Sequence, residues 1–182
     1  MIKEKSGMIV KLIIFQIAMS IFGVMIASSV IILSEGLLLL AGIFSVLFYF
    51  ALVGAALNED GLKDNIRASR ESVAVSAFTG FKYALISYVP TLLITLVLAV
   101  LRTVGVRNSL ISILVVVIRA FLSGMYLGLD TSIFGAGETV MTFSAHGYSF
   151  LIYQMISILA CGVFYYIGFR GINLLPKKKE EN

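Results

Sequence analysis

Charged residues are scarce in this sequence. They make up 13% of the 182 residues, whereas soluble domains contain about 25%. Hydrophobic residues make up 59%, and the mean hydropathy is +1.02. A chain with so little charge cannot cover a globular surface with solvated groups, which excludes a soluble enzyme, a disordered chain and a secreted disulfide scaffold. We therefore expect an integral membrane protein.

Tryptophan is absent, and Cys161 is the only cysteine. The missing tryptophan leaves tyrosines such as Tyr153 and Tyr165 to act as aromatic anchors at the membrane interface. One cysteine cannot form an internal disulfide, so the cysteine content says nothing about the redox compartment. Because His146 is the only histidine, we expect no metal site, which would need three or four ligands, and no cofactor.

Enzyme motifs are also missing. The chain has no His-Glu-x-x-His zinc motif, no Gly-x-Ser-x-Gly nucleophile elbow and no phosphate loop that ends in Gly-Lys-Ser/Thr. Intramembrane aspartyl chemistry needs two facing carboxylates, and only Asp130 lies near an apolar run. We therefore expect neither an enzymatic activity nor a nucleic-acid partner.

Long uncharged runs fill most of the chain. A helix needs about 20 mainly apolar residues to span a bilayer. The sequence therefore predicts an all-α fold, a polytopic transmembrane helix bundle that forms a single domain over residues 1–182. The third run contains Pro90, which removes one backbone hydrogen bond and predicts a kink. The five predicted spans are 12–33, 37–57, 83–101, 110–129 and 150–172.

The connection at 58–71 is densely charged. Asn58 is a candidate N-cap, and acidic residues follow it in the expected first turn. We expect a short helix that lies on the membrane surface. Its basic residues Lys63, Arg67 and Arg70 are candidates for contact with a partner or with lipid.

The distribution of lysine and arginine predicts the orientation. Cytoplasmic loops are rich in these residues, so the lysines near the N-terminus place that end in the cytoplasm. With five spans, seven basic residues lie inside and six outside, which is no bias. A re-entrant segment or sixth crossing at 130–149 would give eleven inside against two outside. We favour this segment, with both termini cytoplasmic; five plain spans with an exterior C-terminus are the alternative.

A single arginine interrupts the fourth run. Arg119 lies near the middle of 110–129, where a charge costs about 2.5–3.5 kcal/mol on insertion scales and usually faces the bundle interior or water. Asp130, Glu138 and His146 follow it and could complete a polar substrate-binding site within the membrane. The alternatives are an arginine that snorkels to the surface and acidic residues that are simply solvated.

Small residues recur at four-residue spacing. Gly124 and Gly128 form one such pair, and Gly23 and Ala27 form another. This spacing allows two helices to approach closely. We expect it to serve packing within the chain rather than a homodimer.

Four places in the chain carry a family resemblance. These are the segment at 61–82, the proline-bearing run after it, Met-Tyr-Leu-Gly at 125–128 and Tyr-Tyr-Ile-Gly at 165–168. In these places the chain resembles small uncharacterised multi-pass membrane proteins of bacteria. This resemblance implies a bacterial cell membrane but no activity. In size and hydrophobicity, the chain is also similar to the six-helix substrate-binding membrane subunits of vitamin transporters.

Two functions follow from the residues. The first is a transport or solute-binding membrane subunit with a polar site around Arg119. The second is a non-transporting scaffold or accessory subunit that docks a partner through 58–71. That partner would be another membrane subunit or a cytoplasmic protein.

Overall fold

The computed structural model describes residues 2–71, 75–103, 113, 117–118, 120–134 and 149–174. All regular structure within these ranges is helical, which confirms the all-α prediction. In chain order the elements are α1 (Ile2–Val30), α2 (Glu35–Glu71), α3 (Thr79–Thr103), the 3-10 helix η1 (Gly124–Tyr126), α5 (Leu127–Phe134) and α7 (Ser149–Phe169).

Four of the described helices, α1, α2, α3 and α7, are long and apolar enough to cross a bilayer. The prediction of a transmembrane bundle is therefore confirmed, but the prediction of five clear spans is wrong. The described part of the fourth run, 110–129, is interrupted at Gly124–Tyr126 by the 3-10 turn. Ser123 precedes this turn with φ −138° and ψ 11°, which is not helical. Hydropathy cannot detect such a break, because the residues on both sides of it are equally apolar.

The charged connection at 58–71 is not a separate surface helix. It continues α2, whose 37 residues extend over about 56 Å at 1.5 Å per residue. Asn58 is completely buried inside this helix and is not an N-cap. The prediction was wrong because Asn58 and Gly61 lie against α7, and because lysine, glutamate and arginine favour the helical conformation. Since the hydrocarbon core is about 30 Å thick, the charged end of α2 projects beyond it.

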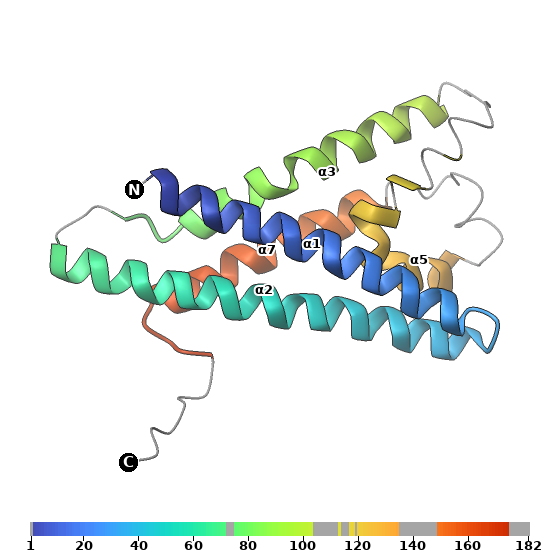
Figure 1. Cartoon of the computed structure of the whole chain (residues 1–182), viewed down its shortest axis with the longest axis horizontal. Helices are drawn as coiled ribbons and strands as arrows, with labels where there is room; N and C mark the ends of the chain where they lie inside the picture. The colour runs from blue at the N-terminus through green and yellow to red at the C-terminus, as the bar shows by residue number, and fades with distance from the viewer. Residues whose placement is uncertain are drawn as a thin grey trace, which may run out of the picture.

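The helices run alternately up and down along the bundle (Figure 1). A tight turn at residues 31–34 joins α1 to the antiparallel α2. The start of α1, the end of α2, the start of α3 and the end of α7 lie together at one end, which we call the basic end (Figure 1). The 31–34 turn and the end of α3 lie at the opposite end, which we call the hairpin end, and α7 begins toward it. Both flanks of the connection between α3 and α7 therefore face the same end.

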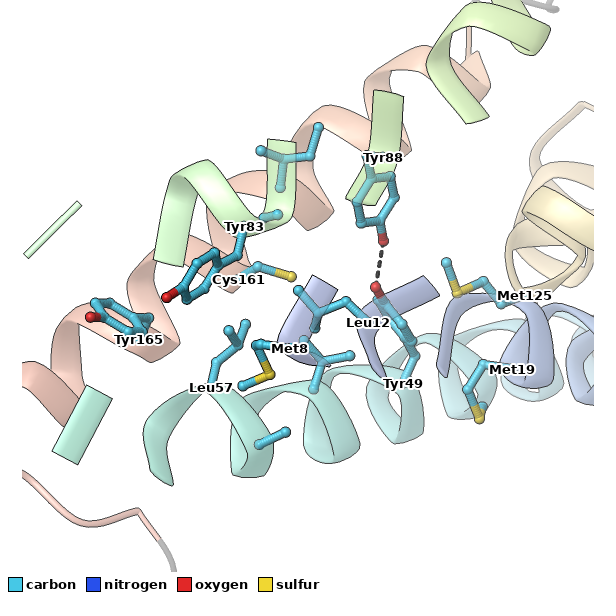
Figure 2. Close-up of a cluster of buried hydrophobic side chains, with 14 of the residues drawn as sticks. Met8, Leu12, Met19, Tyr49, Leu57, Tyr83, Tyr88, Met125, Cys161 and Tyr165 are labelled. Carbon is cyan, nitrogen blue, oxygen red and sulfur yellow. Dashed lines mark hydrogen bonds between the residues drawn. The ribbon is translucent and has the colours of Figure 1, made fainter. Parts of the chain in front are cut away.

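Tyrosines and methionines dominate the interior (Figure 2). The largest completely buried side chains include Tyr49, Tyr88, Tyr126 and Tyr165. Most of the large aliphatic residues lie outside in contrast, although a few such as Leu12 are buried; Leu47, for example, is 61% exposed. This distribution suits a bilayer, in which the outer surface meets hydrocarbon and polar groups must pair internally.

The glycine pairs pack within the chain, as predicted. A Cβ atom at Gly23 would lie 2.7 Å from the carbonyl oxygen of Gly124, and one at Gly128 would lie 2.9 Å from the Cα atom of Gly42. These contacts seat η1 on α1 and α5 on α2. A third contact joins α2 to α7, because a Cβ atom at Gly168 would lie 2.9 Å from the Cα atom of Asn58. Only residues without a side chain permit these distances.

Four crossings predict that both ends of the chain lie on the same side of the membrane. In a Cys161→Ser background, single cysteines at Ser6→Cys and Leu174→Cys should react with a membrane-impermeant maleimide from one side, and Ser34→Cys from the other. Labelling of intact and of lysed cells gives the measurement. Reaction at Ser6→Cys and Leu174→Cys from opposite sides would mean an odd number of crossings and would contradict the topology.

Candidate functional site

Polar side chains gather between α1, α3, η1 and α7. We call five of them the polar layer. The glutamines come from α1 and α7, the threonines from α3, and the serine directly precedes η1. Except for partly exposed Thr95, all are buried. The members are Gln16, Thr91, Thr95, Ser123 and Gln154.

Two glutamine amides hold the polar layer together. Gln16 Nε2 donates to the Thr91 hydroxyl at 2.8 Å and to the carbonyl oxygen of Leu122 at 3.2 Å. Gln154 Nε2 donates to the hydroxyls of Thr95 and Ser123, both at 3.1 Å. The first amide therefore joins α1 to α3, and the second joins α7 to α3. Both also hold the residues before η1 inside the bundle.

One side of the Gln154 amide has no hydrogen-bond partner in the described part of the chain. Its Oε1 atom is buried and accepts no hydrogen bond from any residue that the structure describes. If the amide oxygen and nitrogen were exchanged, the oxygen could accept from the two hydroxyls, because a hydroxyl can either donate or accept. The nitrogen would then be the atom without a partner among the described residues. A buried polar atom without a partner costs about 1–3 kcal/mol. The polar layer therefore has capacity for one further hydrogen-bonding group.

A cluster of hydroxyl groups lies next to the polar layer. Tyr49 and Tyr88 share a hydrogen bond of 2.6 Å (Figure 2), which joins α2 to α3. Tyr126 and Ser157 share one of 2.5 Å, which joins η1 to α7. The Cys161 thiol is buried one turn beyond Ser157. The bond from Tyr126 therefore holds the interrupted helix against α7, while the bond between Tyr49 and Tyr88 holds α2 against α3.

Of the four residues predicted to form a site within the membrane, the structure describes only Asp130. Asp130 is completely buried on α5, and its carboxyl group interacts electrostatically with the Tyr153 hydroxyl. Arg119, Glu138 and His146 lie outside the described residues, so their grouping with Asp130 stays a prediction. Within the predicted segment 130–149, the described residues up to Phe134 form the end of α5, which packs on α2.

The predicted partner surface lies on the projecting end of α2. Lys63, Arg67 and Arg70 are all exposed. Lys63 forms an ion pair with Glu59 at 2.6 Å. The opposite side of the helix faces the bundle, where Asp64 accepts a hydrogen bond of 2.7 Å from the Tyr165 hydroxyl.

Sequence reasoning missed the polar layer as a site. Gln16 and Gln154 are single uncharged residues within long apolar runs, and such residues usually serve helix packing. The signal that could have found them is that each amide needs a partner in hydrocarbon. That signal does not identify the partners, since Gln16 and Thr91 are 75 positions apart.

Comparison with protein-family models, curated proteins and solved structures yields no match for this chain. Over the described ranges, no group of three or more His, Cys, Asp or Glu side chains could hold a metal ion. The candidate site therefore rests on its own chemistry, which is that of neutral hydrogen-bonding groups with a buried carboxyl group on the adjacent α5.

The bond between Tyr49 and Tyr88 predicts measurable coupling. Tyr49→Phe and Tyr88→Phe should each lower the free energy of unfolding by about 0.6–1.7 kcal/mol, the range for hydrogen bonds between membrane helices. The double variant should lose little more than either single one, because both remove the same bond. Reversible unfolding in mixed micelles gives the values. Tyr88→Phe with Tyr165→Phe is the matched control, and it should be additive within about 0.3–0.5 kcal/mol. Equal additivity in both pairs would contradict the coupling.

Proposed function

We propose that the protein is a transport or solute-binding membrane subunit that binds a small polar solute at the polar layer. The observation that carries this proposal is the buried Gln154 amide in the interior of a membrane bundle, one side of which has no partner among the residues that the structure describes. A solute with a hydroxyl or amine group could complete its hydrogen bonds. Enzymatic activity forms no part of the proposal.

The interrupted helix supports this proposal. Leu122, just before η1, lies beside Gln16 near the middle of α1, whereas Gly128 lies against Gly42 nearer the hairpin end. The chain therefore passes from the interior toward the hairpin end through the break at Gly124–Tyr126. Broken helices at membrane depth are tolerated only where protein or a water-lined cavity surrounds them, and they form the substrate sites of many transporters.

Charged residues near this segment would give the site selectivity. Arg119 precedes Leu122 by three positions in the sequence, and Asp130 lies buried on α5. We propose that both contribute to solute binding, with Glu138 and His146 as further candidates. An intramembrane ionisable residue is by default a functional candidate, because its insertion is costly.

We further propose that the basic end faces the cytoplasm of a bacterial cell. Cytoplasmic segments carry the excess of lysine and arginine. Arg102, near the end of α3, lies toward the hairpin end. The described basic residues at the basic end are Lys3, Lys5, Lys11, Lys63, Arg67, Arg70, Lys82 and Arg170.

Thermal stabilisation of the purified protein in detergent tests the solute site. The probes are free amino acids, sugars, nucleosides, vitamins and small inorganic anions. A compound at one hundred times its Kd should stabilise the fold by about 2.7 kcal/mol, and Gln154→Leu should abolish this response. Ser45→Ala is the control, because its buried hydroxyl bonds only to Ala41 of its own helix in the described structure. Arg119→Leu tests the arginine separately.

Two results would contradict the solute site. One is that no compound of the panel stabilises the protein. The other is that Gln154→Leu responds as the unchanged protein does. An unchanged response of Arg119→Leu alone would remove the arginine from the site and leave the polar layer in place.

A second candidate function is an accessory subunit that docks a partner through α2. The supporting observation is that the charged end of α2 projects beyond the hydrocarbon core and exposes Lys63, Arg67 and Arg70. Its other face is occupied, because Gly61 and Asp64 pack against α7. The exposed face is therefore free of the bundle and could meet another membrane subunit or a cytoplasmic protein.

Charge reversal tests this docking role. Arg67→Glu/Arg70→Glu should weaken the binding of a co-purified partner about tenfold or more, which corresponds to 1.4 kcal/mol. Quantitative mass spectrometry of affinity-purified protein gives the measurement. Lys3→Glu/Lys5→Glu makes the same charge change at the same end and should leave the partner bound. Equal recovery of the partner with both variants would argue against docking through α2.

A further inference from the structure

We propose that the basic end carries a binding surface for anionic phospholipid headgroups, formed by Lys11, Lys82 and Arg170. These three exposed residues lie on α1, on α3 and directly after α7, and we call them the basic girdle. The proposal goes beyond solute binding and does not depend on it, since the girdle lies at the boundary of the bundle and not in its interior.

Each member of the girdle lies where the apolar part of its helix meets the basic end. Lys11 directly precedes Leu12, and Lys82 directly precedes Tyr83. Leu12 and Tyr83 are both buried in the core near this end (Figure 2). Arg170 follows the last residue of α7. The three charges therefore lie where the apolar parts of their helices end, which is where lipid headgroups would meet a membrane-spanning bundle.

An aromatic ring accompanies each of these charges. The Lys11 ammonium lies 5.6 Å from the centre of the Phe15 ring. The Arg170 guanidinium lies 5.2 Å from the centre of the Tyr166 ring, and its Nε donates to the Tyr166 hydroxyl at 2.8 Å. Phe78, one turn before Lys82, is 71% exposed. Aromatic rings prefer the membrane interface, so these pairs position the cations beside the phosphates of the leaflet.

Apolar surface next to the girdle favours lipid over a soluble anion. Ile14, one turn from Lys11, is 57% exposed, and Ile86, one turn from Lys82, is 53% exposed. A phospholipid can place its phosphate at the basic side chain and its acyl chains along these residues. A free phosphate ion would use only the charges. Both the charge and the apolar surface therefore fit a lipid.

The other basic residues at this end are less suited to headgroups. Lys63 already forms an ion pair with Glu59, whereas Lys11 acts on the same carboxyl group only as a weaker charge without a hydrogen bond. Arg67 and Arg70 lie about 15 and 20 Å beyond Leu57 along α2, at 1.5 Å per residue, whereas the headgroup layer on each side is about 5–8 Å thick. The end of α2 therefore supplies a control with the same number of charges outside the girdle.

Spin-labelled lipids test the girdle directly. The full chain is reconstituted in phosphatidylcholine vesicles, and electron paramagnetic resonance gives the relative association constants of labelled phosphatidylglycerol and phosphatidylcholine. A basic residue near anionic lipid contributes about fivefold in affinity, so the unchanged protein should prefer phosphatidylglycerol at least fivefold. Lys11→Gln/Lys82→Gln/Arg170→Gln should reduce this preference nearly to one. Lys63→Gln/Arg67→Gln/Arg70→Gln should retain it.

Three results would overturn the proposal. The unchanged protein could show no preference for phosphatidylglycerol. The control variant could lose as much preference as the girdle variant, which would indicate a general effect of net charge. Free glycerol phosphate at millimolar concentration could displace the labelled lipid, which would indicate a site for soluble anions. A preference lost only in the girdle variant and resistant to glycerol phosphate would support the proposal.

Discussion

The constraint on which this structure depends is that hydrocarbon offers no hydrogen bonds. Each buried polar group must find its partner inside the bundle, and the glutamines and tyrosines of the interior do so across helices. Gln16 reaches α3, Gln154 reaches α3 and the start of η1, and Tyr49 reaches Tyr88. The aliphatic residues are left to cover the outside. The result is a bundle held by polar pairs and close packing, since burial of apolar surface gains little when the solvent is itself apolar.

Close backbone contact makes these polar pairs possible. Side chains as short as serine and threonine can bond between helices only where the helices nearly touch. Gly124 seats η1 on α1, and Gly61 and Gly168 bring α2 and α7 together. Ser123 lies directly before the first of these contacts, and Asp64 lies one turn from the second. At these two contacts, the close approach of the backbones is therefore accompanied by a hydrogen bond between helices, such as that from Tyr165 to Asp64.

The sequence predicts the class of this fold well, but it predicts poorly where the helices continue and where they break. Composition and long uncharged runs identify an all-α membrane bundle, and the spacing of Gly124 and Gly128 predicts packing within the chain. The run 110–129 and the charged residues 58–71 were misjudged for one reason. Hydropathy indicates which segments are stable in the membrane. Whether a helix continues or breaks depends on the neighbour against which it packs. Gly124 lies against α1, where the helix is interrupted, whereas Asn58 and Gly61 lie against α7, where the helix continues. The partners of Gln16 and Gln154 could not be predicted either, because they are set by tertiary contacts far apart in the sequence.

The four crossings also account for the distribution of charge. Five plain spans left the lysines and arginines almost evenly divided, and a re-entrant segment at 130–149 was the predicted remedy. Most of this segment lies outside the described residues, so the re-entrant segment stays a prediction. Both flanks of the connection between α3 and α7 face the hairpin end (Figure 1), and α7 runs from there back to the basic end. Basic residues of α1, α2 and α3, and Arg170 directly after α7, then lie at the basic end, while the polar layer remains in the interior. The basic residues that would set the orientation in the membrane therefore lie apart from the amides of the polar layer.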